Sequence, residues 1–349
     1  IMIRDNISNG DWDYDMLSAD WDSSDLQDWG LDVPDWGEET EQGLTDPDDV
    51  IPLSDKYIAP PFSVLDTKQS YWLERKRQWR SIIGDSGESR DHVKTIKNDH
   101  WEGKPYGASA SGFSEHNVSV LDPVLAEVAI KWFAPENAKT LDCFAGDSVF
   151  GFVSDYLGNS FTGIEIRKEQ ADLNNSRLTS ANSVYHCDDG QNVLNYIGKE
   201  TQDFLFSCPP YFDLEVYSDL ENDASNQGDY DGFIEILDNA FTRSVSCLKD
   251  NRFAVIVVGD IRDKKGFYRT FVDDIKRIFI KAGMPLYNEL ILLQPLGTAA
   301  LRANTYMKNR KVVKVHENVL VFYKGDIKNI QSNFNKIEYD EADLESSDI

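Results

Sequence analysis

The sequence predicts an α/β fold built around a mainly parallel sheet. Between residues 116 and 325, short apolar segments alternate with segments whose apolar residues have helical spacing. This alternation is typical of parallel strands joined by right-handed helical crossovers. The chain has 349 residues, 41% of them hydrophobic, which is enough for one sizeable α/β domain with extensions.

The first regular element is a helix over residues 122–133, with Asp122 as its capping residue. Short apolar segments then predict strands at residues 139–144, 160–166, 183–187, 203–207 and 253–258. Helical spacing among these segments predicts helices at residues 167–176, 230–248 and 271–282. Two later segments resemble a closing pair of strands, at residues 289–294 and 318–324.

The front segment, residues 1–55, is acidic and contains four tryptophans, Trp12, Trp21, Trp29 and Trp36. It holds 17 Asp and Glu residues against one Arg, so it contributes −16 to the net charge of −26 and leaves −10 for the rest. Such a composition is typical of a disordered acidic linker. The alternative is a short amphipathic element that docks on a partner or on another domain.

Residues 56–115 form a second extension, which is basic and partly helical. Residues 71–80 combine aromatic and basic side chains and predict a helix. This helix either contacts phosphates or packs Trp72 and Trp79 on the core with its charges in water. The Gly- and Ser-containing residues 103–112 predict a mobile loop.

Several classes of protein do not fit the sequence. No apolar run reaches the roughly 18 residues of a membrane-spanning helix, and the first residues lack the pattern of a signal peptide. None of the four cysteines forms a C-x-x-C pair, so we expect neither a metal site nor a disulfide framework. These observations favour a cytoplasmic protein. The polar, acidic tail over residues 326–349 is expected to be frayed.

Three turns that follow predicted strands carry candidate residues for a cofactor. The small residues of the stretch 141–148 let the backbone approach a ligand at the carboxyl end of a strand. Glu165 ends the next strand and can accept hydrogen bonds from both ribose hydroxyls of an adenosyl ligand. After the third strand, Asp188 or Asp189 can accept one from an adenine amino group, and we favour Asp188. Each turn also has a plainer interpretation as an ordinary connection, a solvent-facing Glu or a turn Asp.

The most specific motif is the stretch 206–212, FSCPPYF, directly after a buried strand. Two prolines fix φ and remove two backbone donors, so nearby carbonyls face a pocket unpaired. The ring of Tyr211 can stack on a flat base. An amine conjugated with a ring is a poor nucleophile, because its lone pair is delocalised into the ring. When protein acceptors bind both of its N–H groups, the lone pair becomes localised on the nitrogen and can attack a sulfonium methyl in line. The alternative is a rigid turn without chemistry.

With these residues the chain resembles the amino-methylating DNA methyltransferases, which act on N6 of adenine or N4 of cytosine. The Phe-x-Gly turn of that family corresponds to Phe144-Ala145-Gly146, and its Pro-Pro-Tyr motif to residues 209–211. The resemblance covers roughly residues 116–325. It implies a Rossmann-like class I S-adenosylmethionine-dependent methyltransferase with a mainly parallel seven-stranded sheet and a closing antiparallel strand.

The resemblance also implies roles for individual residues. S-adenosyl-L-methionine is expected to contact Asp142, Phe144, Ala145, Gly146, Ser148, Glu165 and Asp188. The catalytic residues are expected to be Ser207, Cys208, Pro209, Pro210 and Tyr211. The DNA base would be flipped onto Tyr211, because its amino group is inaccessible inside a stacked duplex. A basic stretch is expected to contact DNA, or else to be a solvated loop, through Arg302, Lys308, Arg310, Lys311 and Lys314.

More closely, the chain is similar to DNA methylases of phages and prophages that are fused behind a ParB-like domain. Residues 61–66, 71–77 and 309–316 carry this similarity. The stretch up to Trp36 looks like the end of such a domain and its acidic linker. The similarity implies DNA modification, with restriction–modification as one setting, and a ParB-like domain as an intramolecular or separate partner.

Two positions depart from the family. Cys208 stands where the family has Asp, Asn or Ser, and a thiol is a weaker acceptor. Either Ser207 and backbone carbonyls compensate, or activity is low. The cofactor turn continues with Asp147-Ser148 and has no second glycine. Cytosine C5 methyltransferases attack the ring with a thiolate that they carry in the order Pro-Cys. This chain has the order Cys-Pro-Pro, which disfavours C5 methylation.

Two other functions stay open at the level of sequence. Pro-Pro-Tyr methyltransferases also act on RNA or on protein glutamine side chains, and a protein substrate would require no basic groove. Alternatively, the chain is a non-catalytic protein whose acidic, Trp-rich front segment mimics DNA or recruits a partner.

Overall fold

The computed structural model of the chain describes residues 53–84, 94–95, 121–212, 215–216, 220, 222–295 and 299–335. The chain divides into two compact units, Ile1–Ile51 and Pro52–Ile349, and every described residue belongs to the second. The predictions for the acidic front segment and for the loop at residues 103–112 therefore lie outside the described residues.

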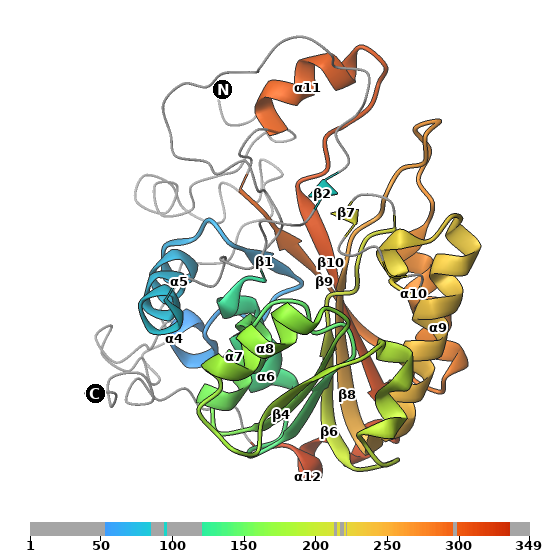
Figure 1. The fold of residues 1–349 in the computed structure, drawn as a ribbon. Coiled ribbons are helices and arrows are strands. Elements are labelled where there is room, and N and C mark those ends of the chain that lie inside the picture. Colours follow the sequence, from blue (N-terminus) through green and yellow to red (C-terminus); the bar gives the residue numbers. More distant parts are fainter. Residues whose placement is uncertain are drawn as a thin grey trace, which may run out of the picture. The chain divides into compact units, whose positions relative to one another are not determined.

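The second unit is built on an eight-stranded sheet with the order β1-β9-β10-β8-β6-β3-β4-β5 (Figure 1). Strand β10 runs antiparallel to both neighbours, β8 and β9, and the other neighbouring pairs are parallel. The strands are β1 (Val64–Asp66), β3 (Lys139–Asp142), β4 (Ser160–Glu165), β5 (Val184–Cys187), β6 (Gln202–Ser207), β8 (Leu248–Val258), β9 (Leu286–Leu293) and β10 (His316–Lys324). A separate antiparallel pair joins β2 (Lys94–Thr95) to β7 (Glu215–Val216).

This arrangement confirms the predicted fold class. Seven strands in the order β5-β4-β3-β6-β8-β10-β9, with one antiparallel strand near the edge, form the Rossmann-like sheet of class I methyltransferases. The sequence does not predict the eighth strand, β1, which pairs with the edge strand β9 through Val64, Leu65 and Asp66. It extends the sheet beyond seven strands with residues from the basic extension.

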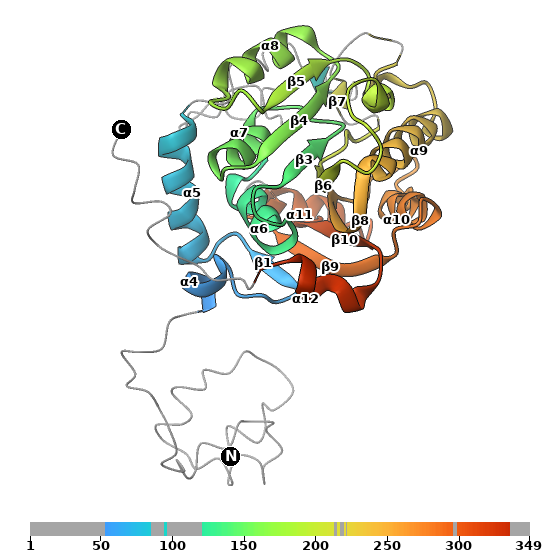
Figure 2. The ribbon, with the colours of Figure 1, turned by 90° about the horizontal axis from the view of Figure 1, so that it is seen from below.

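Helices cover both faces of the sheet (Figure 2). One face carries α5 (Ser70–Ile83), α6 (Pro123–Phe133), α7 (Val149–Tyr156) and α8 (Lys168–Arg177). The other carries η3 (Gly190–Asn195), α9 (Tyr230–Cys247) and α10 (Phe271–Lys281). Shorter or peripheral helices are α4 (Leu53–Tyr57), η4 (Ala224–Asn226), α11 (Ala299–Met307), η5 (Ile327–Asn329) and α12 (Ile330–Asn333). None of the described helices is long and apolar enough to cross a membrane.

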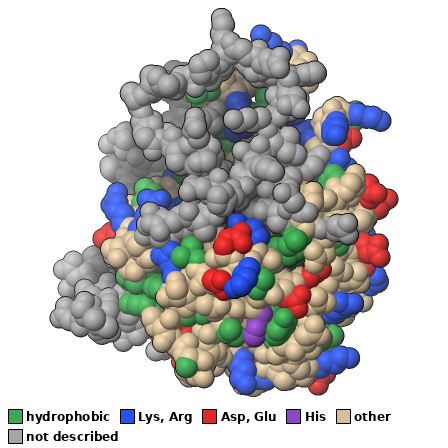
Figure 3. Space-filling model, in the orientation of Figure 1, with side chains coloured by type: hydrophobic (Ala, Val, Ile, Leu, Met, Phe, Trp, Pro, Cys, Tyr) green, Lys and Arg blue, Asp and Glu red, His purple; other side chains and the backbone are tan. Residues whose placement is uncertain are grey.

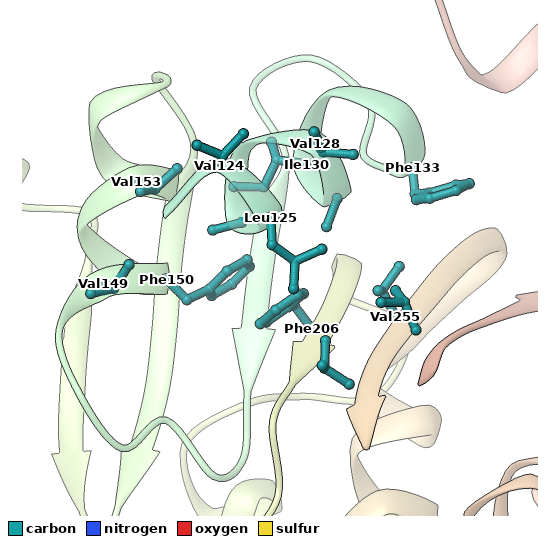
Figure 4. Close-up of a cluster of buried hydrophobic side chains, with 14 of the residues drawn as sticks. Val124, Leu125, Val128, Ile130, Phe133, Val149, Phe150, Val153, Phe206 and Val255 are labelled. Atoms are coloured by element: carbon teal, nitrogen blue, oxygen red, sulfur yellow. The ribbon is translucent and has the colours of Figure 1, made fainter. Parts of the chain in front are cut away.

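Helix α6 is buried almost all round, because it lies between the sheet and its neighbouring helices. It begins as predicted, with the Asp122 carboxylate accepting a hydrogen bond from the backbone N–H of Val124 at 3.0 Å. Its apolar side chains meet those of α7 and of β6 and β8 in one continuous core, which includes Phe150 and Phe206 (Figure 4). This packing fixes the position of the turn between β3 and α7.

Helix α5 packs on α6 through the two tryptophans of the basic extension. Trp72 and Trp79 are fully buried, as the packing interpretation of this helix expects. Their indole N–H groups donate to Asp122 (3.1 Å) and to Glu127 (2.7 Å). Arg75 forms a buried ion pair with Glu127, with a 2.9 Å bond from Nε. The extension is therefore part of the same core, held by buried polar contacts as well as apolar ones.

The start of the acidic tail is ordered, contrary to the prediction of a frayed tail from residue 326. Residues 327–333 form η5 and α12, and Phe334 packs against Phe253 with ring centroids 5.1 Å apart. The apolar residues Ile330 and Phe334 reach the core and overcome the polar composition around them. Residues 336–349 lie outside the described part.

Candidate active site

A cavity of about 560 Å³ opens at the carboxyl ends of the parallel strands. The chain runs from β3 out to β5 and then returns to β6 on the other side of β3, so the strand order reverses between β3 and β6. Open α/β sheets bind ligands at such a reversal. Residues from the ends of β3, β4, β6 and β8 line the cavity, together with Thr67 and Lys76 of the basic extension.

Four of the predicted cofactor residues line one part of this cavity as a single turn: Asp142, Phe144, Ala145 and Gly146. The Asp142 carboxylate accepts a 2.9 Å hydrogen bond from the backbone N–H of Phe144, which closes the turn. Gly146 has φ +51°, a conformation that side-chain-bearing residues rarely adopt. Opposite this turn, a Cβ at Gly190 would lie 2.3 Å from the Cys143 carbonyl oxygen, so only glycine fits there.

Glu165 lines the cavity at the end of β4, as predicted. Its carboxylate accepts a 2.9 Å bond from the backbone N–H of Arg167. Burial raises the pKa of Glu165 to about 7, opposed by the Arg167 charge. Burial likewise raises the pKa of Asp142 to about 7. Two desolvated carboxyl groups therefore face the same cavity and are ready to accept hydrogen bonds from a ligand.

Two predicted cofactor residues do not line the cavity. Ser148 is buried at the start of α7. Asp188 directs its carboxylate away, accepting bonds from Asn192 (2.8 Å) and Tyr196 (2.8 Å). Asp189, the alternative that the sequence left open, lines the cavity instead. Asp189 is the capping residue of η3, and its carboxylate accepts a 2.8 Å hydrogen bond from the backbone N–H of Gln191. The sequence alone does not show which of the two neighbouring Asp residues lines the cavity.

The Pro-Pro-Tyr stretch follows β6 and lies beside the cofactor turn. Cys208, Pro209, Pro210 and Tyr211 all line the cavity. Ser207 does not, because its hydroxyl is fully buried and donates a 2.7 Å hydrogen bond to Asp142. Ser207 therefore positions the cofactor turn, and it does not replace the missing acceptor at Cys208.

The thiol of Cys208 is neutral. Burial raises its pKa well above the ordinary value, and the negative charge of Glu317 adds to the effect. A thiolate nucleophile needs the opposite, a neighbourhood that lowers the pKa. The site therefore argues against the ring attack that cytosine C5 methylation requires.

Residues that the sequence does not single out complete the far side of the cavity. Glu317 accepts a 2.9 Å hydrogen bond from the Tyr211 hydroxyl and a 2.8 Å bond from Gln294. Both Glu317 and Gln294 line the cavity, as does Asp260 after β8. Because β10 runs antiparallel to β8 and β9, its first residues lie at the edge of the sheet where those two strands end. This is the signal that could have found Glu317.

The five predicted DNA-contacting residues separate into two groups. Arg302 on α11 and Lys308 and Arg310 in the following turn are exposed, and Lys311 lies near them with its ammonium 5.1 Å from the Tyr306 ring centroid. Lys314 lines the cavity instead. Its Nζ is buried and has no hydrogen-bond partner among the described residues. A Cβ at Gly259 would lie 2.8 Å from this Nζ and 3.5 Å from the Tyr211 hydroxyl, so both groups lie against Gly259.

Comparisons with known proteins assign the chain to no family. No family model matches the chain, and no curated protein matches it. Among solved structures, it is similar to a candidate DNA modification methylase from Thermus thermophilus, at 20% identity over 42% of this chain and 53% of that chain, with a TM-score of 0.31. It is also similar to TrmN from Thermus thermophilus, at 12% identity over 58% and 49%, with a TM-score of 0.38.

A third similar structure is a TehB-like SAM-dependent methyltransferase from Corynebacterium glutamicum, at 16% identity over 55% of this chain and 82% of that one, with a TM-score of 0.34. The match spans only about half of the two Thermus chains, 53% and 49% of their lengths. Because identities and TM-scores are low, the assignment of the fold rests on the strand order of the chain itself.

Proposed function

We propose that this chain transfers a methyl group from S-adenosyl-L-methionine to the exocyclic amine of a DNA base, N6 of adenine or N4 of cytosine. One observation carries the proposal: the cofactor turn, Glu165 and the Pro-Pro-Tyr stretch line one cavity at the point where the strand order reverses. A rigid turn without chemistry would not require this meeting of three separate motifs.

The cofactor end of the cavity fits an adenosyl ligand. Glu165 offers carboxylate oxygens for two ribose hydroxyls, and Asp189 offers an acceptor for an adenine amino group. The glycines at positions 146 and 190 leave the backbone open for close approach. When bound, S-adenosyl-L-methionine would supply an electrophilic methyl group on its sulfonium. The chain's own residues would hold it in line with the target amine.

The substrate end fits a flat, amine-bearing group. Tyr211 presents an aromatic ring for stacking, and its hydroxyl is tied to Glu317. We propose that backbone carbonyls of the Pro209-Pro210 stretch, together with Glu317, accept the two amine N–H groups. Lys314 offers a donor for a ring nitrogen or oxygen. A base inside a duplex must be flipped to reach this depth. The exposed basic residues near α11, Arg302, Lys308, Arg310 and Lys311, are proposed to hold the DNA backbone.

The test is methyl transfer from labelled S-adenosyl-L-methionine to unmodified duplex DNA, followed by mass spectrometry of the nucleosides. We expect N6-methyladenine or N4-methylcytosine. Tyr211→Ala should lower kcat/KM about 10- to 100-fold, because base–aromatic stacking contributes ~1–3 kcal/mol. Tyr211→Phe keeps the ring and should lose far less.

Each other result points to a different function. Cofactor binding with transfer to RNA or to protein glutamine, and none to DNA, would replace the substrate class. The absence of both cofactor binding and transfer would favour the non-catalytic, partner-binding alternative.

A further inference from the structure

The connection between β8 and α10 is a preformed turn that projects from the rim of the cavity (Figure 1). Gly259, Asp260 and Ile261 line the cavity, and the chain then leaves the body of the protein. It returns at Arg269, whose backbone N–H donates to the Ile261 carbonyl at 2.9 Å. The turn therefore begins and ends beside the site that would hold the target base.

Several internal bonds hold this turn in one shape. The Asp263 carboxylate accepts 2.9 Å hydrogen bonds from the backbone N–H groups of Lys265 and Phe267. Arg262 donates to the Gly266 carbonyl at 2.8 Å and lies over the Tyr268 ring, 3.8 Å from its centroid. The turn is thus built before any partner arrives, which lowers the entropy cost of binding.

The tip of this turn exposes an aromatic ring between cations. Phe267 is 72% exposed, the largest exposed fraction of any aromatic side chain among the described residues. Arg262, Lys264 and Lys265 give the tip three positive charges against the one negative charge of Asp263. Arg269, at the base of the turn, lies over the rings of Phe212 and Tyr230. In a chain of net charge −26 this local excess is unusual, and basic side chains are visible in this part of the surface in Figure 3. An exposed ring costs solvation free energy unless a partner covers it, and cations around it favour an anionic partner.

We propose that the turn of residues 261–269 is a wedge that enters duplex DNA, with Phe267 stacking in the gap that the flipped base leaves. This proposal rests on the proposed function. Apolar side chains that enter base steps unstack them and stabilise distorted DNA. Lys264 and Lys265 hold the adjoining phosphates. The wedge begins at Ile261, which lines the cavity together with Gly259 and Asp260, so the opened step and the extruded base lie next to each other.

The decisive experiment compares methyl transfer to duplex and to single-stranded DNA of the same sequence, using the full chain. Phe267→Ala should slow transfer to the duplex about tenfold, because stacking of one ring on bases is lost. It should leave transfer to the single strand within twofold, since a single strand needs no opening. Phe267→Trp should restore the duplex rate. Phe62→Ala is the matched control, because this ring is 62% exposed, lies just before β1 and does not line the cavity.

A second measurement tests the wedge without turnover. Fluorescence anisotropy gives the affinity for a labelled duplex with one abasic site and for the intact duplex. Phe267→Ala should weaken binding to the abasic duplex about tenfold, and Phe62→Ala should not. Lys264→Ala/Lys265→Ala should lower the salt slope of log K by about 1.8.

Equal duplex rates and equal abasic-site affinities for wild type and Phe267→Ala would overturn the wedge, and continued methylation of DNA would leave the proposed function standing. A wild-type chain that methylates only single strands and binds neither duplex would also overturn it. Absence of transfer to any DNA would overturn both.

Discussion

The thiol of Cys208 occupies the position at which the resembling family has a carboxylate, an amide or a hydroxyl. It is neutral and lies beside Pro209 in the cavity. A thiol accepts hydrogen bonds weakly, so the amine of a substrate depends on neighbouring carbonyls and on Glu317 for its acceptors. Cys208 is thus the weakest contact in the proposed reaction.

Replacing Cys208 with Asn should therefore raise kcat. One better-formed hydrogen bond contributes ~1 kcal/mol, which corresponds to about a fivefold gain in single-turnover rate. Cys187→Asn is the control, because Cys187 is exposed and lies outside the cavity. A lower rate in Cys208→Asn, with normal cofactor binding, would show that the thiol is adapted to its role.

The two desolvated carboxyl groups at the cofactor end make stability depend on pH. Burial raises the pKa of Glu165 from its ordinary 4.5 to about 7. Between these values the folded chain binds a proton that the unfolded chain has released, so stability falls as pH rises through this window. Asp142 acts in the same direction.

Glu165→Gln has no carboxyl group to titrate, so it should remove the contribution of Glu165 to this fall in stability, on the order of 2 kcal/mol between pH 5 and pH 7.5. Chemical denaturation of the ligand-free chain at both pH values measures the difference. Glu169→Gln, an exposed neighbour on α8, should keep the wild-type dependence. If Glu165→Gln keeps it as well, the carboxyl group is solvated and its pKa is ordinary.

Helix α5 supports the site, although its residues lie far before the turn of residues 142–146 in the sequence. Trp72 and Lys76 both donate to Asp122, which caps α6, and α6 packs on the helix that follows the cofactor turn. The buried pair Arg75–Glu127 holds α5 against α6. Removing one partner of such a pair leaves an uncompensated charge in the core.

Arg75→Leu should consequently lower the free energy of unfolding by about 3–5 kcal/mol. Arg77→Leu changes the same residue type on the exposed side of the helix and should cost less than about 0.5 kcal/mol. Denaturant titration of both variants decides. Equal losses would mean that the ion pair adds no specific stability.

Elements with strong periodicity are predictable from the sequence, and short ones are not. The strands β3 to β6 and β8 to β10 and the helix α6 follow from apolar pattern and capping. Strand β1 has three residues, too few to show a period, and it exists because the edge of β9 offers hydrogen-bond partners. The mostly apolar α7, eight residues long, carries no clear helical period either.

The same contrast holds for the site. Motifs that are continuous in sequence, such as residues 142–146 and 208–211, are found directly, and the structure brings them together. Gln294 and Glu317 come from elements distant in the chain, and only the antiparallel course of β10 places Glu317 beside Tyr211. The choice between Asp188 and Asp189 depends on the direction of a side chain, which no local pattern specifies.

More than half of the net negative charge of the chain lies in residues 1–51. Residues 1–51 hold 16 acidic residues against one arginine. Their removal changes the net charge from −26 to −11. A less negative chain should associate with DNA faster, because its long-range repulsion is weaker.

Deleting residues 1–51 should leave methyl transfer within about twofold of wild type at moderate salt and raise DNA affinity at low salt. Transfer assays and DNA titrations at two ionic strengths give both quantities. Loss of activity in a folded, truncated chain would assign the acidic segment a direct part in function.

The antiparallel strand β10 has one more consequence. Strands β9 and β10 are paired along seven positions, and the connection between them leaves and re-enters the sheet at the rim of the cavity. The part of this connection between Pro295 and Lys314, which both line the cavity, can therefore vary in length and composition while the strands fix the register of the sheet. Under the proposed function, replacing part of this one connection would change the target sequence while the strands of the sheet stay as they are.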